Sequence, residues 1–151
     1  MEIVLNTINR EIVNTRIFDV PHYVLFEAWS HPEHLAAWWG PKGFTNTFHE
    51  FDFKSGGIWK FTMHGPDGID YQNKSVFEEI TKPEKIVFTH LKPMHKFRVT
   101  ATFDALGPQT KLIFRMLFES VEECERVKLF VIDANEENFD KLEEYIQKNL
   151  K

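Results

Sequence analysis

The sequence predicts an α+β fold in which a curved antiparallel sheet is covered by one long C-terminal helix. Strand-like segments separated by turn signals run from Phe44 to Phe118, and several of them alternate between apolar and polar residues. Helical spacing of apolar residues follows Ser120. A sheet with one apolar face needs a cover, which the helix can supply. With 151 residues and 42% hydrophobic content, we expect a single domain spanning residues 1–151.

The N-terminal part predicts one strand followed by two short helices. Residues 12–19 alternate as a strand does, and Pro21 ends this strand. Ser30 is expected to cap a second helix that Gly40-Pro41 terminates. The apolar residues at helical spacing in the first helix are Val24, Leu25, Ala28 and Trp29.

The central part predicts an antiparallel meander. Gly or Pro marks a turn at 56–57, 65–68, 82–84, 92–93 and 107–108. Alternation places three sets of residues on one concave surface. These sets are Trp59, Phe61 and Met63; Phe97, Val99, Ala101 and Phe103; and Leu112, Phe114, Met116 and Phe118.

A long amphipathic helix is predicted at the C-terminal end. Ser120 and Glu123 have the spacing of a capping box. Cys124 is the only cysteine, so no intramolecular disulfide can form, and its place on the helix favours a small buried residue over a reactive thiol. The recurring positions are Cys124, Val127, Val131, Ala134, Asn138, Leu142, Tyr145 and Ile146.

Composition argues against several classes of partner. The formal net charge is -5, the pI is about 5.8, and no Lys/Arg cluster is longer than a pair, which argues against nucleic-acid binding. No segment approaches the roughly 20 apolar residues of a membrane span. We therefore expect a cytoplasmic protein without a membrane span.

Aromatic residues exceed what a core of this size needs. Fifteen Phe and four Trp leave enough rings to line a cavity between sheet and helix, although core packing is about as probable for any one of them. His64 and His90 are possible polar groups at such a pocket. The candidate ligand-binding residues are Trp38, Trp39, Phe44, Trp59, Phe61, Met63, His64, Tyr71, Phe88 and Phe103.

Catalytic and metal-binding signals are weak. The seven His show no zinc-ligand spacing with cysteine, so no metal and no cofactor is expected. No nucleophile with a base and no pair of carboxylates can be recognised; Asp52, Glu78 and Glu79 are expected on the surface. Arg115 alternates away from its apolar neighbours and should face solvent. An enzyme is therefore less expected than a binding protein.

Several motifs together resemble a known family. They are residues 16–21 (RIFDVP), 28–35 (AWSHPEHL), 38–41 (WWGP), 56–59 (GGIW), 63–68 (MHGPDG), 77–80 (FEEI) and 83–86 (PEKI). The chain resembles the activator of heat shock protein 90 ATPase-like family, within the START-like (SRPBCC) helix-grip superfamily. The resemblance implies a sheet that grips the last helix around a hydrophobic cavity. Relatives often carry a Gly-containing segment where this chain has residues 133–138, and they often form homodimers.

Three functions follow from this reading. The favoured one is a binder of a small hydrophobic or aromatic molecule in the cavity. The resemblance also allows a co-chaperone-like module that interacts with a chaperone ATPase, although shared fold does not transfer function. A cyclase- or hydrolase-like enzyme using the same cavity is the third.

Overall fold

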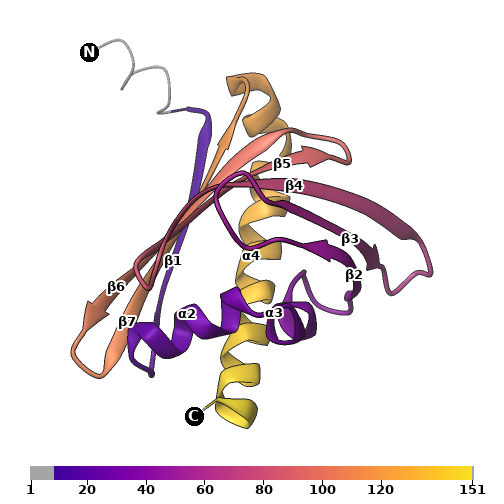
Figure 1. The fold of residues 1–151 in the computed structure, drawn as a ribbon. Coiled ribbons are helices and arrows are strands. Elements are labelled where there is room, and N and C mark those ends of the chain that lie inside the picture. Colours follow the sequence, from indigo (N-terminus) through magenta and orange to yellow (C-terminus); the bar gives the residue numbers. More distant parts are fainter. Residues whose placement is uncertain (1–8, 151) are drawn as a thin grey trace.

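The computed structural model describes residues 9–150, which form a seven-stranded sheet and three helices (Figure 1). In chain order the elements are β1 (Glu11–Phe18), α2 (His22–Ser30), α3 (Pro32–Trp38), β2 (Thr45–Phe51), β3 (Ile58–His64), β4 (Asp70–Thr81), β5 (Lys85–Lys92), β6 (Phe97–Leu106), β7 (Gln109–Phe118) and α4 (Val121–Asn149). This order confirms the predicted α+β helix-grip arrangement.

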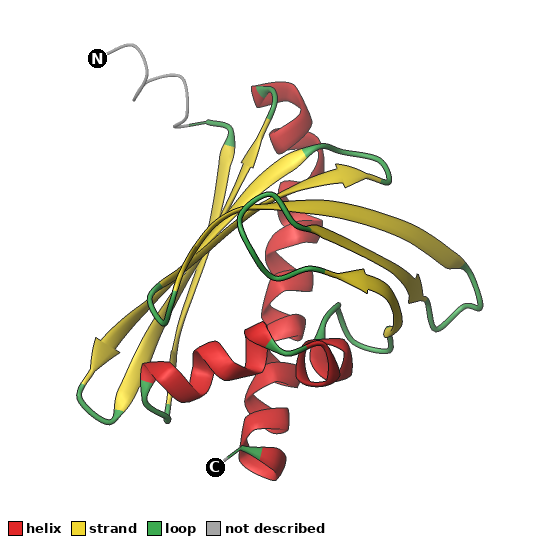
Figure 2. Cartoon of the chain, in the orientation of Figure 1, coloured by secondary structure: helices red, strands yellow, loops and turns green. Residues whose placement is uncertain are grey.

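The sheet is antiparallel throughout and has the order β1-β7-β6-β5-β4-β3-β2. Strands β2 to β7 form the predicted meander, and β1 joins its far edge beside β7. Register shifts interrupt β2 at Phe48/Glu50 and β4 at Lys74/Ser75 and Phe77/Glu79. Because such bulges bend a strand and increase its twist, they help the sheet to curve around α4 (Figure 2).

The concave face of the sheet carries the apolar core. Alternation buries Val99, Ala101 and Phe103 on β6, as predicted, and Phe114 on β7. Helix α4 packs Phe139 against this face, with ring centroids 5.7 Å from Phe114 and 6.1 Å from Phe18. Arg115 points away from the core toward Glu11. The core therefore lies between the sheet and the long helix.

Helices α2 and α3 cover one end of this core (Figure 1). One boundary differs from the prediction: Ser30 is the last residue of α2, and its hydroxyl donates to the carbonyl of Glu27. His31 occupies the N-cap position of α3 instead, without a side-chain cap. Because Pro32 at the first turn has a preset φ and no N–H, that turn needs less help from a capping side chain.

The start of α4 follows the prediction in part. Ser120 Oγ accepts a hydrogen bond from the backbone N–H of Glu123 at 3.1 Å, as an N-cap does. The Glu123 carboxylate does not return to Ser120; it lies 2.7 Å from His95 Nδ1. Half of the expected capping box is therefore replaced by a contact between α4 and the loop before β6.

Candidate ligand-binding site

A cavity of about 160 Å³ lies between the concave face of the sheet and α4. Residues from the strands β3 to β7, from the loop after α3 and from α4 border it. They are Trp39, Gly40, Pro41, Trp59, Phe61, Met63, Asn73, Ser75, Phe88, His90, Phe97, Val99, Phe114, Met116, Ala134, Asn135 and Asn138. The lining is mostly apolar, and none of these side chains is an Asp, Glu, Lys or Arg.

Aromatic rings form one wall of the cavity. Trp39 lies just after α3, and its ring centroid is 5.2 Å from Trp59 and 6.1 Å from Phe88. Trp59 and Phe88 also contact each other edge to face at 5.3 Å. Such offset contacts hold the rings in fixed orientations. The wall is thus a set of interlocked rings from the α3 end and two strands.

A row of residues crosses the sheet beside these rings. Trp59 on β3 pairs with Ser75 on β4, Ser75 pairs with His90 on β5, and His90 pairs with Phe97 on β6. All four border the cavity. Ser75 is 1% exposed and His90 is 9% exposed, so two polar side chains are buried in the apolar face. The sheet register therefore brings hydrogen-bonding groups together on one side of the cavity.

His90 is held in a defined orientation. Its ring stacks on Phe97, with centroids 4.6 Å apart, and Nε2 lies 3.0 Å from the carbonyl oxygen of Pro93. A carbonyl can only accept, so Nε2 donates and carries the proton of the neutral ring. Burial, and to a smaller extent the charge of His95, lowers the pKa of His90. His90 is therefore neutral near pH 7, with Nδ1 as an acceptor.

Gly40 closes the cavity where the chain leaves α3. Its φ of 101° lies in the left-handed region, and a Cβ at this position would lie 2.7 Å from Met63 Cε. The Gly40 N–H donates to Asn138 Oδ1 of α4 at 3.1 Å. The positive φ favours glycine at this position, and Asn138 fixes the segment to the helix.

Lys141 holds the same segment from one turn further along α4. Its Nζ donates to the carbonyl oxygens of Phe44 at 2.9 Å, Pro41 at 3.3 Å and Trp39 at 3.5 Å. Burial lowers the pKa of the Lys141 ammonium group. Three carbonyl dipoles around one cation anchor the segment that carries Trp39.

Half of the predicted ligand-binding residues border the cavity. These are Trp39, Trp59, Phe61, Met63 and Phe88. Of the adjacent tryptophans, Trp39 lines the space, whereas Trp38 is buried behind it and donates its Nε1–H to the carbonyl of Ala28 at 3.0 Å. Trp38 thus belongs to the core under α2 and α3.

Three further predicted residues lie outside the lining. Phe44 and Tyr71 contact each other beyond Met63, with ring centroids 6.2 Å apart. His64 bonds Thr47 at 2.7 Å and Asp70 at 2.8 Å on the other face of the sheet. None of the three borders the cavity.

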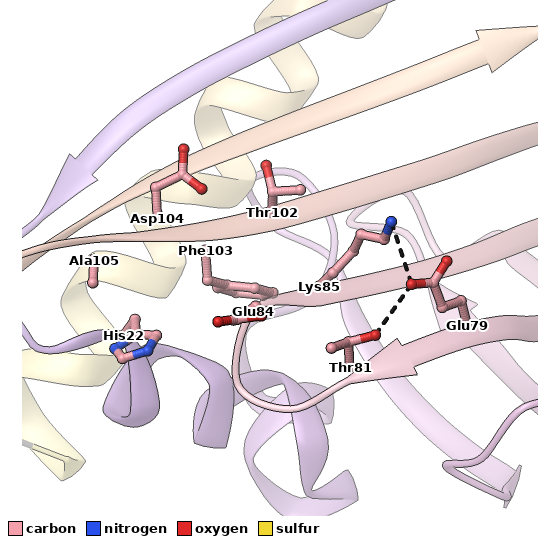
Figure 3. Close-up of a pocket in the computed structure, with 9 residues that line it drawn as sticks. All are labelled: His22, Glu79, Thr81, Glu84, Lys85, Thr102, Phe103, Asp104 and Ala105. Carbon is pink, nitrogen blue, oxygen red and sulfur yellow. Dashed lines mark hydrogen bonds and ion pairs between the residues drawn. The ribbon is translucent and has the colours of Figure 1, made fainter.

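Phe103 lies beside a different hollow, at the end of the sheet near α2 (Figure 3). Its ring packs against Phe26 and Trp29. Three of its polar groups pair with one another: the Glu79 carboxylate lies 3.2 Å from Lys85 Nζ and accepts from Thr81 at 3.1 Å. Because most of its lining residues are polar or charged, this hollow is a weaker candidate site for an apolar molecule than the cavity.

Four polar residues of the lining were not among the predicted ligand-binding residues, namely Asn73, Ser75, Asn135 and Asn138. A signal for two of them was present. Asn73 and Ser75 have the same parity as the buried Phe77 on β4, so alternation alone places them on the concave face. Their polarity at inward positions could have marked the site.

Other candidate chemical groups lie away from the cavity. Asp52, Glu78 and Glu79 are exposed, as expected. Cys124 is buried, and burial raises the pKa of its thiol. Within residues 9–150, no group of three or more His, Cys, Asp and Glu side chains could hold a metal ion. Over the same residues, no helix has the length and apolar character needed to cross a membrane.

Comparison with known families decides the relationship. The profile of the family described as "Activator of Hsp90 ATPase homolog 1-like protein" matches residues 19–147, which is most of the chain. The chain belongs to this family. The resemblance inferred from the motifs is therefore confirmed. A search of curated proteins finds no match for this member of the Hsp90 ATPase activator homolog 1-like family.

Solved structures share the fold of this family member at low sequence identity. A protein from Arthrobacter aurescens has 21% identity and a TM-score of 0.86, covering 95% of this chain and 89% of its own. A protein from Nitrosomonas europaea has 16% identity and a TM-score of 0.85, covering 93% and 96%. The AHSA1 protein from Silicibacter pomeroyi has 20% identity and a TM-score of 0.75, covering 91% and 97%. Identities at this level establish the shared fold alone.

Proposed function

We propose that this protein binds a small ring-containing apolar molecule between its sheet and α4. The observation that carries the proposal is the cavity walled by Trp39, Trp59 and Phe88. Binding sites for small molecules are concave and mostly apolar, with a few placed polar groups. Aromatic walls favour a planar ring, because ring pairs gain from offset or edge contacts as well as from burial.

The volume supports a molecule with a single ring. The cavity measures about 160 Å³. An apolar protein cavity of about 150 Å³ is known to accept benzene. One six-membered ring with a small substituent therefore matches the available space, whereas a fused multi-ring compound would require the walls to move.

Toluene is the probe for this proposal, because it has one ring and no polar group. The protein is titrated with toluene in a thermal-shift assay, and binding is read from the rise in melting temperature. Ala134→Leu places a larger side chain in the cavity lining, and Ala37→Leu is the matched control on the exposed surface of α3. We expect toluene to stabilise the parent and Ala37→Leu but not Ala134→Leu. Equal responses in all three, or none, would refute the proposal.

Interaction with a chaperone of the Hsp90 class is the second candidate function, suggested by the family name. An exposed apolar pair on α4 favours it: Leu129 is 81% exposed and Phe130 is 74% exposed. Large exposed apolar groups side by side are typical of protein contacts. An ATPase assay with the cognate chaperone tests this, comparing Leu129→Ser/Phe130→Ser with the control Ile17→Ser on the outer face of β1. An unchanged ATPase rate with the parent protein would remove this candidate.

Catalysis within the cavity has less support. Ser75 and His90 are the lining residues whose side chains could serve as nucleophile and base. Among the described residues no hydrogen bond joins Ser75 to His90, and His90 Nε2 is directed to Pro93. The pair therefore enters the proposal as hydrogen-bonding groups of a binding site.

A further inference from the structure

The cavity has a polar side that an apolar molecule would leave unused. Ser75 and His90 are direct neighbours across β4 and β5, and Trp59 is the neighbour of Ser75 on β3. All three are buried and border the cavity. A polar side chain on a buried sheet face costs free energy unless it finds a partner. The chemistry available to these three groups therefore indicates what they contact.

Two side-chain atoms of this row have no hydrogen-bond partner within residues 9–150. No described residue hydrogen-bonds to Ser75 Oγ. The indole Nε1–H of Trp59 also lacks an acceptor, but this atom has almost no accessible surface and is therefore closed to a molecule in the cavity. Polar atoms in protein interiors are nearly always satisfied, so a hydroxyl without a partner beside a cavity indicates a ligand or a water molecule. The row thus offers one hydroxyl that can donate or accept.

His90 supplies an acceptor next to this hydroxyl. The Pro93 carbonyl fixes the proton on Nε2, so Nδ1 of the neutral ring presents a lone pair. No described residue donates to Nδ1. A group that bonds both side chains therefore donates to His90 Nδ1 and accepts from the Ser75 hydroxyl. A hydroxyl group does both with one oxygen atom.

The charge of the lining excludes the ionic alternatives. No Asp, Glu, Lys or Arg borders the cavity, so a carboxylate or an ammonium group on the ligand would be buried without a counter-charge. The ammonium group of Lys141, one turn beyond Asn138 on α4, is directed to the carbonyls of the segment from Trp39 to Phe44. The matching head group is uncharged.

We propose that the ligand is an uncharged single-ring compound carrying a hydroxyl group, of the phenol class. Its ring packs against Trp39, Trp59 and Phe88, and its hydroxyl hydrogen-bonds Ser75 and His90. This inference rests on the proposed binding function and specifies the chemistry of the molecule at the same site.

Phenol and toluene test the proposal, because they have the same shape and differ in one hydroxyl against one methyl group. Affinities are measured by isothermal titration calorimetry on the full chain, with benzoate and benzylamine as charged counterparts. A purely apolar cavity would favour toluene, because phenol must lose its hydration on entry. We expect phenol to bind about tenfold more tightly than toluene, and the two ions to bind weakly or not at all.

Two variants locate the preference. Ser75→Ala removes the hydroxyl with little change of volume, and His90→Phe keeps a ring that can stack on Phe97. Each should reverse the preference in favour of toluene while toluene itself still binds. Retention of the phenol preference in both variants would overturn the assignment of these residues.

The parent protein alone separates the two proposals. If toluene binds as tightly as phenol or more tightly, the phenol assignment is wrong and the apolar binding function stands. If benzoate or benzylamine equals phenol, the uncharged head group is wrong. If none of the four compounds binds, the binding function fails, and the phenol assignment fails with it.

Discussion

Replacing Ala134 by leucine distinguishes an empty space from a packed core. Ala134 borders the cavity on α4, so a larger side chain can extend into a volume of about 160 Å³. Ala28 on α2 is also a helical alanine, but it is 0% exposed and lies in the aromatic core under the sheet. The same substitution at the two positions should have opposite effects on stability.

The magnitudes follow from three added carbon atoms. Burying each one contributes about 0.8 kcal/mol, so a leucine that fits the cavity gains about 2 kcal/mol. The lower helix propensity of leucine reduces this gain in stability by a few tenths of a kcal/mol. At Ala28 the added carbons have no space, and such overpacking costs about 1–3 kcal/mol. We therefore expect the free energies of unfolding of the two variants to differ by about 3–5 kcal/mol.

Urea denaturation followed by circular dichroism measures both free energies of unfolding under one buffer condition. Ala134→Leu should shift the transition midpoint to higher urea, and Ala28→Leu should shift it to lower urea, with unchanged slopes. If Ala134→Leu destabilises the protein as much as Ala28→Leu, the space beside α4 is already filled, and the argument for a binding cavity fails.

Three further predictions test local interactions. Asn138→Ala removes the acceptor for the buried N–H of Gly40 and should lower the free energy of unfolding by about 1–3 kcal/mol in the same urea assay. Because burial lowers the pKa of His90, this side chain takes up a proton in the unfolded chain at a higher pH than in the folded protein. As the pH falls below about 6.5, the free energy of unfolding should therefore drop by up to about 1.4 kcal/mol per pH unit. His90→Phe should reduce this drop in urea titrations between pH 7.5 and 5, and an unchanged pH profile would contradict the assignment. Ser120→Ala should cost about 1 kcal/mol as the loss of an N-cap, whereas Ser30→Ala should stay within about 0.5 kcal/mol, and equal losses would mean that the two hydroxyls do not differ as described.

Most of the fold could be predicted, because each element carries its own periodic signal. On β6, the alternation of Val99, Ala101 and Phe103 with polar residues fixed both the strand and its buried face. The start of α3 was harder, because Ser30 and Pro32 together satisfy the sequence rule for a capped helix. Only the backbone path decides whether Ser30 ends one helix or begins the next.

The site is less completely predictable, because ring type alone does not tell which aromatic residues border the cavity. Trp59 and Phe88 border the cavity, but Phe103 is equally aromatic and about as buried and lies elsewhere. The difference between these residues is their position along the strand relative to α4, which depends on long-range packing. Asn138 depends on the same contact, because nothing in the local sequence joins it to Gly40.

The placement of the polar row gives a physical reason for a cavity at this position. Ser75 is the smallest side chain in its row, and Ala134 is the smallest on the adjoining face of α4. Large rings on either side keep the helix away from the sheet, so two small residues leave a space that the backbone cannot collapse to fill. A chain with fifteen Phe could have filled that space with one more ring. Instead it keeps a serine and a histidine there, at a cost in stability, and such local exceptions to core packing are characteristic of functional sites.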